Sequence, residues 1–195
     1  MKSLLFGIVF LTFGFMPNKS DHKKSSLEVI NLNFGLIEEK GFKVYHETVP
    51  FPIDHLIGID FFNLTDFKKA FEVYNLGLIN LDIIDSNINQ EDLDYIKKEV
   101  FDINIRPLKT YQLNLHDSIF IIEKPTIIAN RPETLFPDTS TYLISWPVFS
   151  RDGQFAMIYE LKRCGLDCGG GQINFFMKNR DGDWEKIGSI ITSLH

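Results

Sequence analysis

The sequence has few cysteines and no excess of positive charge. Its 195 residues include two Cys, and 20 Lys and Arg stand against 26 Asp and Glu, a formal net charge of −6. Two Cys cannot form a multi-disulfide scaffold or a four-cysteine zinc site. A nucleic-acid-binding domain concentrates Lys and Arg on a basic surface, which this composition does not favour. We therefore expect no nucleic-acid partner and assign no cofactor and no metal.

The sequence also lacks an apolar run long enough to cross a bilayer as a helix, which takes about 20 residues. One shorter run follows Lys2, covers residues 4–16 and ends in polar residues. This is the order of a secretory signal peptide. We predict that residues 1–20 are a signal peptide, cleaved between about Phe15 and Asp21. The protein would then be periplasmic or extracellular, with no stable membrane insertion after signal removal.

The expected mature chain, residues 21–195, has the size of one domain. Its net charge is −8, because the signal carries Lys2 and Lys19 and no acidic residue. With 44% hydrophobic residues and 18 Phe in the whole sequence, a folded core is expected and disorder is not. The polar residues 21–26 are expected to be a mobile lead-in to this single globular domain.

The first half of the mature chain mixes strand and helix patterns. Apolar residues alternate over 27–36 and recur over 42–49, which predicts two strands. Thr65 and Asn89 are suitable N-caps for two amphipathic helices. The buried faces of these helices would consist of Phe67, Ala70, Phe71 and Tyr74 in the first and of Leu93, Ile96 and Val100 in the second.

The second half of the chain is dominated by strand and turn patterns. Turn residues that include Gly153 and Gly182 separate short apolar runs, which is typical of hairpins. The predicted strands cover 112–122, 126–129, 142–149, 154–163, 172–179 and 183–192. The sequence thus predicts an α+β fold with an antiparallel β-meander in the C-terminal half, clearest over 142–192. Two or three amphipathic helices would pack on one side of it.

Three short patterns mark about the last fifty residues. They are Ser145-x-Pro147-x-Phe149-Ser150-x-Asp152-Gly153, then Cys164-Gly165-x-x-Cys168-Gly169-x-Gly171, and finally Lys178 with Gly182-x-Trp184. This region resembles the C-terminal part of a group of uncharacterised exported bacterial proteins. The resemblance implies a secreted antiparallel domain, and it brings no activity and no catalytic residue.

The two cysteines, Cys164 and Cys168, lie four residues apart in a glycine-rich connection between predicted strands. In an oxidising compartment this spacing favours a structural disulfide. A redox-active pair is the alternative, but the spacing is one residue longer than Cys-x-x-Cys. Zinc would need two further ligands, and no His is near in sequence. Glycines 169–171 lack the helix and Lys of a phosphate loop, so we interpret them as a turn.

Histidines next to acidic residues are the candidates for catalysis. His116, Asp117 and Ser118 include the residue types of a hydrolase triad, but in a strand the Asp would face away from the other two. His46 and His55 lie near acidic residues without a pattern that joins them. We therefore interpret these histidines as surface or core residues.

Two other features concern binding. Asn179, Asp181 and Asp183 suggest calcium, but the Gly and Glu of an EF-hand loop are absent, which favours a turn. Trp146 and Trp184 are expected in the core or at a sheet edge, with binding of a glycan or peptide as their alternative role. Overall, the sequence predicts an exported non-catalytic binding or structural domain with an unknown protein or glycan partner. The alternatives are a secreted hydrolase whose site forms only in three dimensions and an acidic inhibitor or immunity-type protein.

Overall fold

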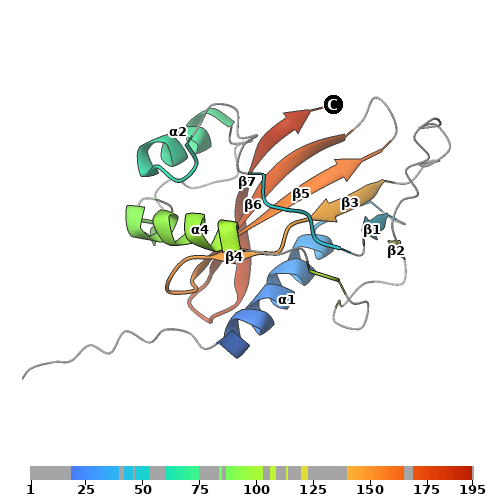
Figure 1. Ribbon diagram of the computed structural model, residues 1–195, viewed down its shortest axis with the longest axis horizontal. Helices are drawn as coiled ribbons and strands as arrows, with labels where there is room; N and C mark the ends of the chain where they lie inside the picture. Colours follow the sequence, from blue (N-terminus) through green and yellow to red (C-terminus); the bar gives the residue numbers. More distant parts are fainter. Residues whose placement is uncertain are drawn as a thin grey trace, which may run out of the picture.

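The structure is a computed structural model in which three helices and a mixed sheet are described (Figure 1). It describes residues 19–39, 42–45, 47–52, 60–74, 84, 87–102, 106–108, 113, 120–122, 140–164 and 169–194. The helices are α1 (Lys19–Gly35), α2 (Leu64–Tyr74) and α4 (Gln90–Asp102). The strands are β1 (Lys43–Tyr45), β2 (Phe120–Ile122), β3 (Thr141–Ile144), β4 (Val148–Phe149), β5 (Phe155–Arg163), β6 (Gly169–Lys178) and β7 (Trp184–Leu194).

The strands form one sheet in the order β2-β1-β3-β5-β6-β7, and β4 pairs with β5 beside this path. The pairs β3–β5, β4–β5, β5–β6 and β6–β7 are antiparallel, whereas β1 lies parallel to β2 and β3. The antiparallel part lies in the C-terminal half, as predicted. The α+β class is therefore confirmed, with a short parallel extension at one edge of the sheet.

Two glycines form the turns of the meander as expected. Gly153 (φ 69°) lies between β4 and β5, and Gly182 (φ 89°) lies between β6 and β7. Residues other than glycine seldom adopt such positive φ values. In the second turn the Asn179 side chain accepts hydrogen bonds from the amides of Asp181 and Asp183, at 3.0 Å each. The turn interpretation of this Asn-x-Asp-x-Asp segment is therefore confirmed.

The strand predicted over residues 27–36 is wrong, because this segment belongs to helix α1. The expected lead-in, residues 21–26, forms earlier turns of the same helix. The side chains that α1 buries are Ser26, Val29, Ile30, Asn33 and Phe34, spaced as one face of a helix. Two of the five are polar, so the apolar residues alone do not reveal the helical period.

The two amphipathic helices predicted in the first half are present. Asn89 caps α4, since its Oδ1 accepts a hydrogen bond from the Asp92 amide at 3.1 Å, and Asp92 Oδ2 accepts one from the Asn89 amide at 3.2 Å. The predicted cap of α2 is wrong by two residues. Asn63 Oδ1, not Thr65, accepts hydrogen bonds from the amides of Thr65 and Asp66. The predicted buried faces are confirmed for the residues whose side chains the structure describes, which are Phe67, Ala70, Phe71, Leu93, Ile96 and Val100.

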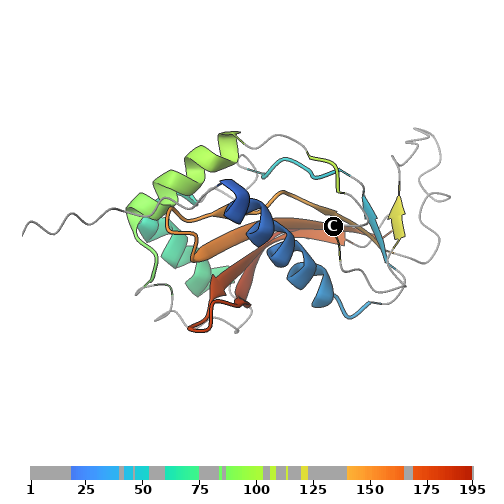
Figure 2. The same ribbon diagram turned by 90° about the horizontal axis from the view of Figure 1, so that it is seen from below.

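The helices cover both faces of the sheet, so the prediction that they pack on one side is wrong. Figures 1 and 2 show α2 and α4 close together and α1 apart from them. Along β5, Phe155, Met157 and Tyr159 pack under α2 and α4, whereas Ala156 and Ile158 pack under α1. Side chains alternate along a strand, so the central strand is buried on both sides.

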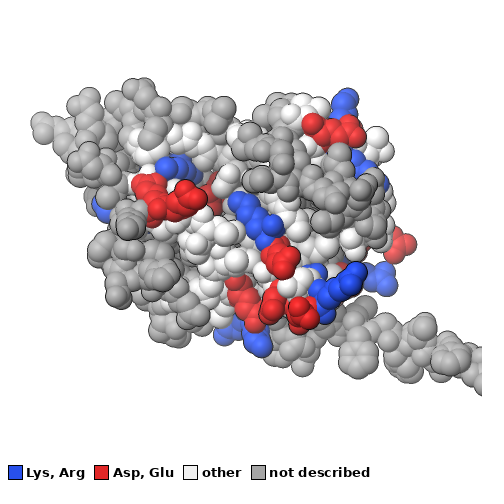
Figure 3. Space-filling view, turned by 180° about the vertical axis from the view of Figure 1, so that it is seen from behind, with Lys and Arg blue, Asp and Glu red and all other residues white. Residues whose placement is uncertain are grey.

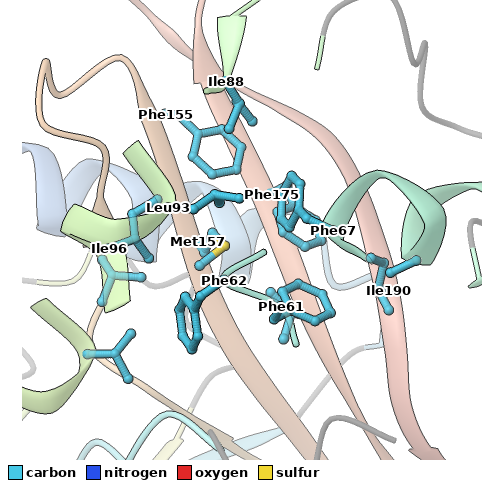
Figure 4. Packing of buried hydrophobic residues seen from close by; sticks show 14 of the residues in the cluster. Phe61, Phe62, Phe67, Ile88, Leu93, Ile96, Phe155, Met157, Phe175 and Ile190 are labelled. Carbon is cyan, nitrogen blue, oxygen red and sulfur yellow. The ribbon is translucent and has the colours of Figure 1, made fainter. Parts of the chain in front are cut away.

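We call the two clusters the α2–α4 core and the α1 core. The α2–α4 core is rich in phenylalanine, and Figure 4 shows its rings converging on the sheet from the helices and from the segment before α2. Phe175 lies at its centre, with ring centroids 4.6–6.2 Å from those of four other phenylalanines: Phe61, Phe67, Phe71 and Phe155. The α1 core combines apolar residues with buried polar ones, and it positions the candidate site.

Candidate functional site

A groove lies between helix α1 and the turn that joins β6 to β7. Its volume is about 650 Å³, and it is lined by Lys24, Ser25, Glu28, Asn31, Leu32, Lys178, Gly182, Asp183 and Trp184. One wall is a helix that the sequence did not predict, and the other is a hairpin that it did. Most of the lining side chains are polar or charged, which suits a polar ligand.

Trp184 is the aromatic residue of this groove and one of the two tryptophans singled out from the sequence. Only 8% of its surface is exposed. Its ring lies 5.7 Å from that of Phe149 and 5.1 Å from the Lys178 ammonium. The indole Nε1 is buried and has no hydrogen-bond acceptor within the described part of the chain. A buried donor without a partner is uncommon, and each such group calls for an explanation.

Trp146, the other tryptophan, belongs to the same α1 core and does not line the groove. It is 9% exposed, and the Arg106 guanidinium lies 4.9 Å from its ring centroid. The two tryptophans are thus largely buried and do not form an exposed pair. Their role in binding remains a prediction, and only Trp184 has a position that supports it.

A buried polar cluster joins α1 to the sheet at Glu160, and we call it the Glu160 cluster. Asn33 Nδ2 donates to Glu160 Oε2 at 2.7 Å, and Gln172 Nε2 donates to Oε1 at 2.8 Å. Asn174 Nδ2 donates to Asn33 Oδ1 at 2.7 Å and lies 3.4 Å from Glu160 Oε2. Oε2 of Glu160 therefore holds α1 on the sheet through Asn33, whereas Oε1 joins the neighbouring strands β5 and β6.

Burial changes the ionisation of this cluster. Desolvation raises the pKa of Glu160 above its usual value of 4.5, although hydrogen bonds from Asn33 and Gln172 oppose the change. Desolvation also lowers the pKa of Lys186, and the negative charge of Glu160 acts in the opposite direction. Perturbed groups such as these often mark functional sites, but structural networks produce them as well.

A second polar contact holds the chain just after α1. Glu39 Oε2 lies 2.8 Å from Lys162 Nζ and accepts a hydrogen bond from the Tyr142 hydroxyl at 3.2 Å. Its Oε1 accepts one from the Ser140 amide. Partial burial by itself raises the pKa of Glu39, but the contacts with Lys162 and Ser140 outweigh it and hold the pKa at about 2.

Several of the predicted site residues lie outside the described part of the chain, namely Cys168, His46, His55 and His116. Cys164 follows the last residue of β5 and is half-buried. Within the described ranges, no group of three or more His, Cys, Asp or Glu side chains is arranged to hold a metal ion. No helix among the described residues is both long and apolar enough to span a membrane.

The Glu160 cluster was not found from the sequence, and Lys178 was noted there only as part of the C-terminal pattern and not as a site residue. One signal was available, because residues 155–159 form an unbroken apolar run that ends directly at Glu160. A run without alternation is typical of a strand buried on both faces. An acidic residue at its end is therefore a candidate for burial. Nothing local predicts its partner Asn33, which is 127 residues away.

No protein-family model, curated protein or solved structure matches this chain. The fold, the groove and the Glu160 cluster therefore carry the functional argument.

Proposed function

We propose that the protein is an exported, non-catalytic binding domain whose ligand occupies the groove between α1 and the β6–β7 turn. The observation that carries this proposal is the lining of the groove. It offers ammonium groups of Lys24 and Lys178, the carboxylate of Glu28 and the polar side chains of Ser25 and Asn31. These are groups that hold a ligand by hydrogen bonds and charge.

The position of Glu160 also supports binding over catalysis. Glu160 is the most deeply buried acidic residue in the described part of the chain, but it is not in the groove lining. Its two oxygens accept hydrogen bonds from Asn33 and Gln172. A general acid or base must reach the substrate directly or through one water, whereas this carboxylate is used to fix a helix. We therefore assign Glu160 a structural role.

The export part of the proposal includes a disulfide between Cys164 and Cys168. In the β5–β6 hairpin, Arg163 pairs with Gly169. Cys164 directly follows this pair, and Cys168 lies outside the described residues. The disulfide is the pairing expected for two cysteines at this spacing in an oxidising compartment.

Intact-mass analysis of the exported protein tests the export part. We expect a chain cleaved between Phe15 and Asp21 that is 2 Da lighter than the fully reduced form. An uncleaved chain in the cytoplasmic fraction would contradict export. Two cysteines that both react with a thiol reagent without prior reduction would contradict the disulfide.

A photo-crosslinking amino acid placed in the groove tests the binding part. We propose to install it at Ser25 in the full chain and, as a control, at Lys98, which is exposed on α4. Illumination in the native envelope should give a specific adduct at position 25 and none at position 98. No adduct, or the same adducts at both positions, would count against the groove. A basic protein in the adduct would specify an inhibitor-type function.

The hydrolase alternative needs a separate measurement. Purified mature protein would be assayed with generic ester and peptide substrates. We expect no turnover above that of buffer. Turnover that disappears in His46→Ala, His55→Ala or His116→Ala would replace the binding proposal with a catalytic one.

A further inference from the structure

The groove contains hydrogen-bond donors and charges that the chain itself does not use. Trp184 Nε1 is buried without an acceptor among the described residues. The Lys178 ammonium lies over the ring of the same tryptophan, and within the described ranges no carboxylate oxygen lies within 4 Å of it. Of these two donors, the Lys178 ammonium belongs to a half-buried side chain that lines the groove, so it favours a ligand that brings an acceptor.

Lys178 is the cation of the groove lining that has no carboxylate partner among the described residues. Lys24 lies 3.7 Å from Glu28, so these two largely offset each other. Asp183 lines the groove as well, but it is exposed to solvent in the β6–β7 turn. Figure 3 shows acidic and basic side chains interspersed on the side of the molecule turned away from the viewer in Figure 1. Because exposed charges are screened beyond about 8 Å at physiological salt, the nearest groups decide which ligand is favoured.

Lys186 is a further lysine of β7 that is not part of the groove lining. It pairs with Phe176 in the ladder, two residue pairs beyond the Lys178–Trp184 pair, and it lies on the same face of β7 as Trp184. The side chain is half-buried, and no carboxylate in the described part of the chain is within ion-pair distance of it. Its burial lowers its pKa. The negative charge of Glu160 acts on Lys186, so this lysine is associated with the Glu160 cluster and Lys178 is left as the cation of the groove.

Stacking of a sugar ring on Trp184 is not supported. Lys178 lies over the indole ring, Phe149 lies 5.7 Å from it, and only 8% of the residue is exposed. A phosphate carries up to two negative charges and is typically bound at the N-terminus of a helix, whereas the groove is lined by later turns of α1, from Lys24 onward. A single carboxylate matches the single unpaired cation of the lining.

We propose that the groove binds a carboxylate-bearing ligand, whose carboxylate contacts the Lys178 ammonium beside Trp184. This inference rests on the proposed binding function and specifies the chemistry of its ligand. The carboxylate can belong to a peptide C-terminus or to an acidic sugar, because both offer the same acceptor.

Trp184 fluorescence tests this proposal in the mature full-length chain. In a Trp146→Phe background Trp184 is the only tryptophan. The probes are two matched pairs: N-acetyl-triglycine with its C-terminal amide, and glucuronate with glucose, all at constant ionic strength. We expect the charged member of one pair to change the emission saturably and to bind at least about tenfold more tightly than its neutral partner. The responding pair identifies the source of the carboxylate.

Three lysine variants provide the controls. Lys178→Gln should weaken binding of the carboxylate at least about tenfold, Lys178→Arg should retain it, and Lys98→Gln on the exposed face of α4 should match the parent. If Trp146→Phe does not fold, calorimetric titration of the wild-type chain gives the same comparison.

Equal binding of charged and neutral probes, or an unchanged affinity in Lys178→Gln, would overturn the carboxylate proposal and leave the binding function intact. Absence of any response to the carboxylates up to about 10 mM, an affinity weaker than 3 kcal/mol, would also overturn it. The crosslinking experiment at Ser25 tests separately whether the groove binds any ligand. Failure of the carboxylate proposal can therefore be told apart from failure of the binding function.

Discussion

The two faces of the sheet are covered in different ways. On one face, α2 and α4 bury a phenylalanine-rich core in which ring packs against ring. On the other face, α1 contributes Val29, Ile30 and Phe34 to an apolar core and also joins the buried Glu160 cluster. The α2–α4 core provides apolar burial, which is strong and non-directional. The α1 core provides directional hydrogen bonds, which fix the position of the helix that forms one wall of the groove.

From this difference we infer that stability depends mainly on one face, and the proposed ligand would bind at the other. Removing apolar side-chain volume should therefore lower the free energy of unfolding most under α2 and α4. Removing a polar side chain should loosen the docking of α1 most when that side chain lies under α1. The following predictions test this division.

The largest effect is expected from Phe175→Ala. Phe175 is fully buried and contacts four other phenylalanine rings. Loss of such a side chain lowers the free energy of unfolding by about 3–5 kcal/mol. Urea denaturation gives the value. Phe101→Ala is the matched control, because that ring is 65% exposed, and it should change stability by less than about 0.5 kcal/mol. Similar losses in both variants would contradict the proposed centre of the α2–α4 core.

Asn33→Ala should have the next largest effect. It removes the donor to Glu160 Oε2 and the acceptor for Asn174 Nδ2. Buried polar groups left without partners cost about 1–3 kcal/mol. Amide hydrogen exchange should accelerate in α1 while α4 keeps its protection. Lys23→Ala on the exposed side of the same helix is the control. Uniform acceleration across both helices would show that α1 does not open independently.

The helix caps on the α2–α4 side should contribute less. Asn63→Ala and Asn89→Ala each remove a side chain that accepts a hydrogen bond from the first turn of a helix. We expect a loss of about 1 kcal/mol from each, measured by urea denaturation. Thr65→Ala, at the cap position that the sequence suggested, should cost clearly less. A larger loss from Thr65→Ala than from Asn63→Ala would contradict the observed cap.

The smallest effect is a pH dependence of opposite sign at two glutamates near α1. The pKa of Glu39 is held at about 2, below its usual 4.5, so its stabilising contacts are present above pH 4.5 and are lost as the pH falls towards 2. The pKa of Glu160 is raised, mainly by desolvation. The native state therefore binds a proton more readily than the unfolded chain, and stability increases as the pH falls through the native pKa of Glu160.

Urea denaturation of the wild type, Glu39→Gln and Glu160→Gln across the acidic range checks these signs. The advantage of the wild type over Glu39→Gln should shrink towards pH 2. Relative to Glu160→Gln, the wild type should gain stability as the pH falls. Parallel pH profiles for the wild type and Glu160→Gln would show that the buried carboxyl does not titrate as inferred.

Local patterns in the sequence predicted the C-terminal half well and the first helix badly. Strands β5, β6 and β7 follow short apolar runs, and the turns before β5 and β7 contain Gly153 and Gly182. Each of these signals acts within a few residues. Helix α1 was mistaken for a strand because Ser26 and Asn33 occupy its buried face. A polar residue is buried only if a partner satisfies it, and the partner of Asn33 belongs to a strand far along the chain.

The candidate site divides in the same way. From the sequence, Trp184 was expected in the core or at a sheet edge, with binding as its alternative role. Its surroundings, Lys178 across the ladder and α1 opposite, depend on strand register and helix docking. The histidines and Cys168 lie outside the described residues, and the predictions made for them stay predictions.

By itself, the sequence determined the strand periods of the meander, its glycine turns, the Asn89 cap and the buried faces of two helices. These features depend on backbone preferences and on side chains a few residues apart. Only the tertiary structure decided that α1 covers the second face, that Glu160 is buried and that a groove lies beside Trp184. The contacts responsible join residues up to 141 positions apart, and they become favourable only when the folded chain brings their partners out of water together.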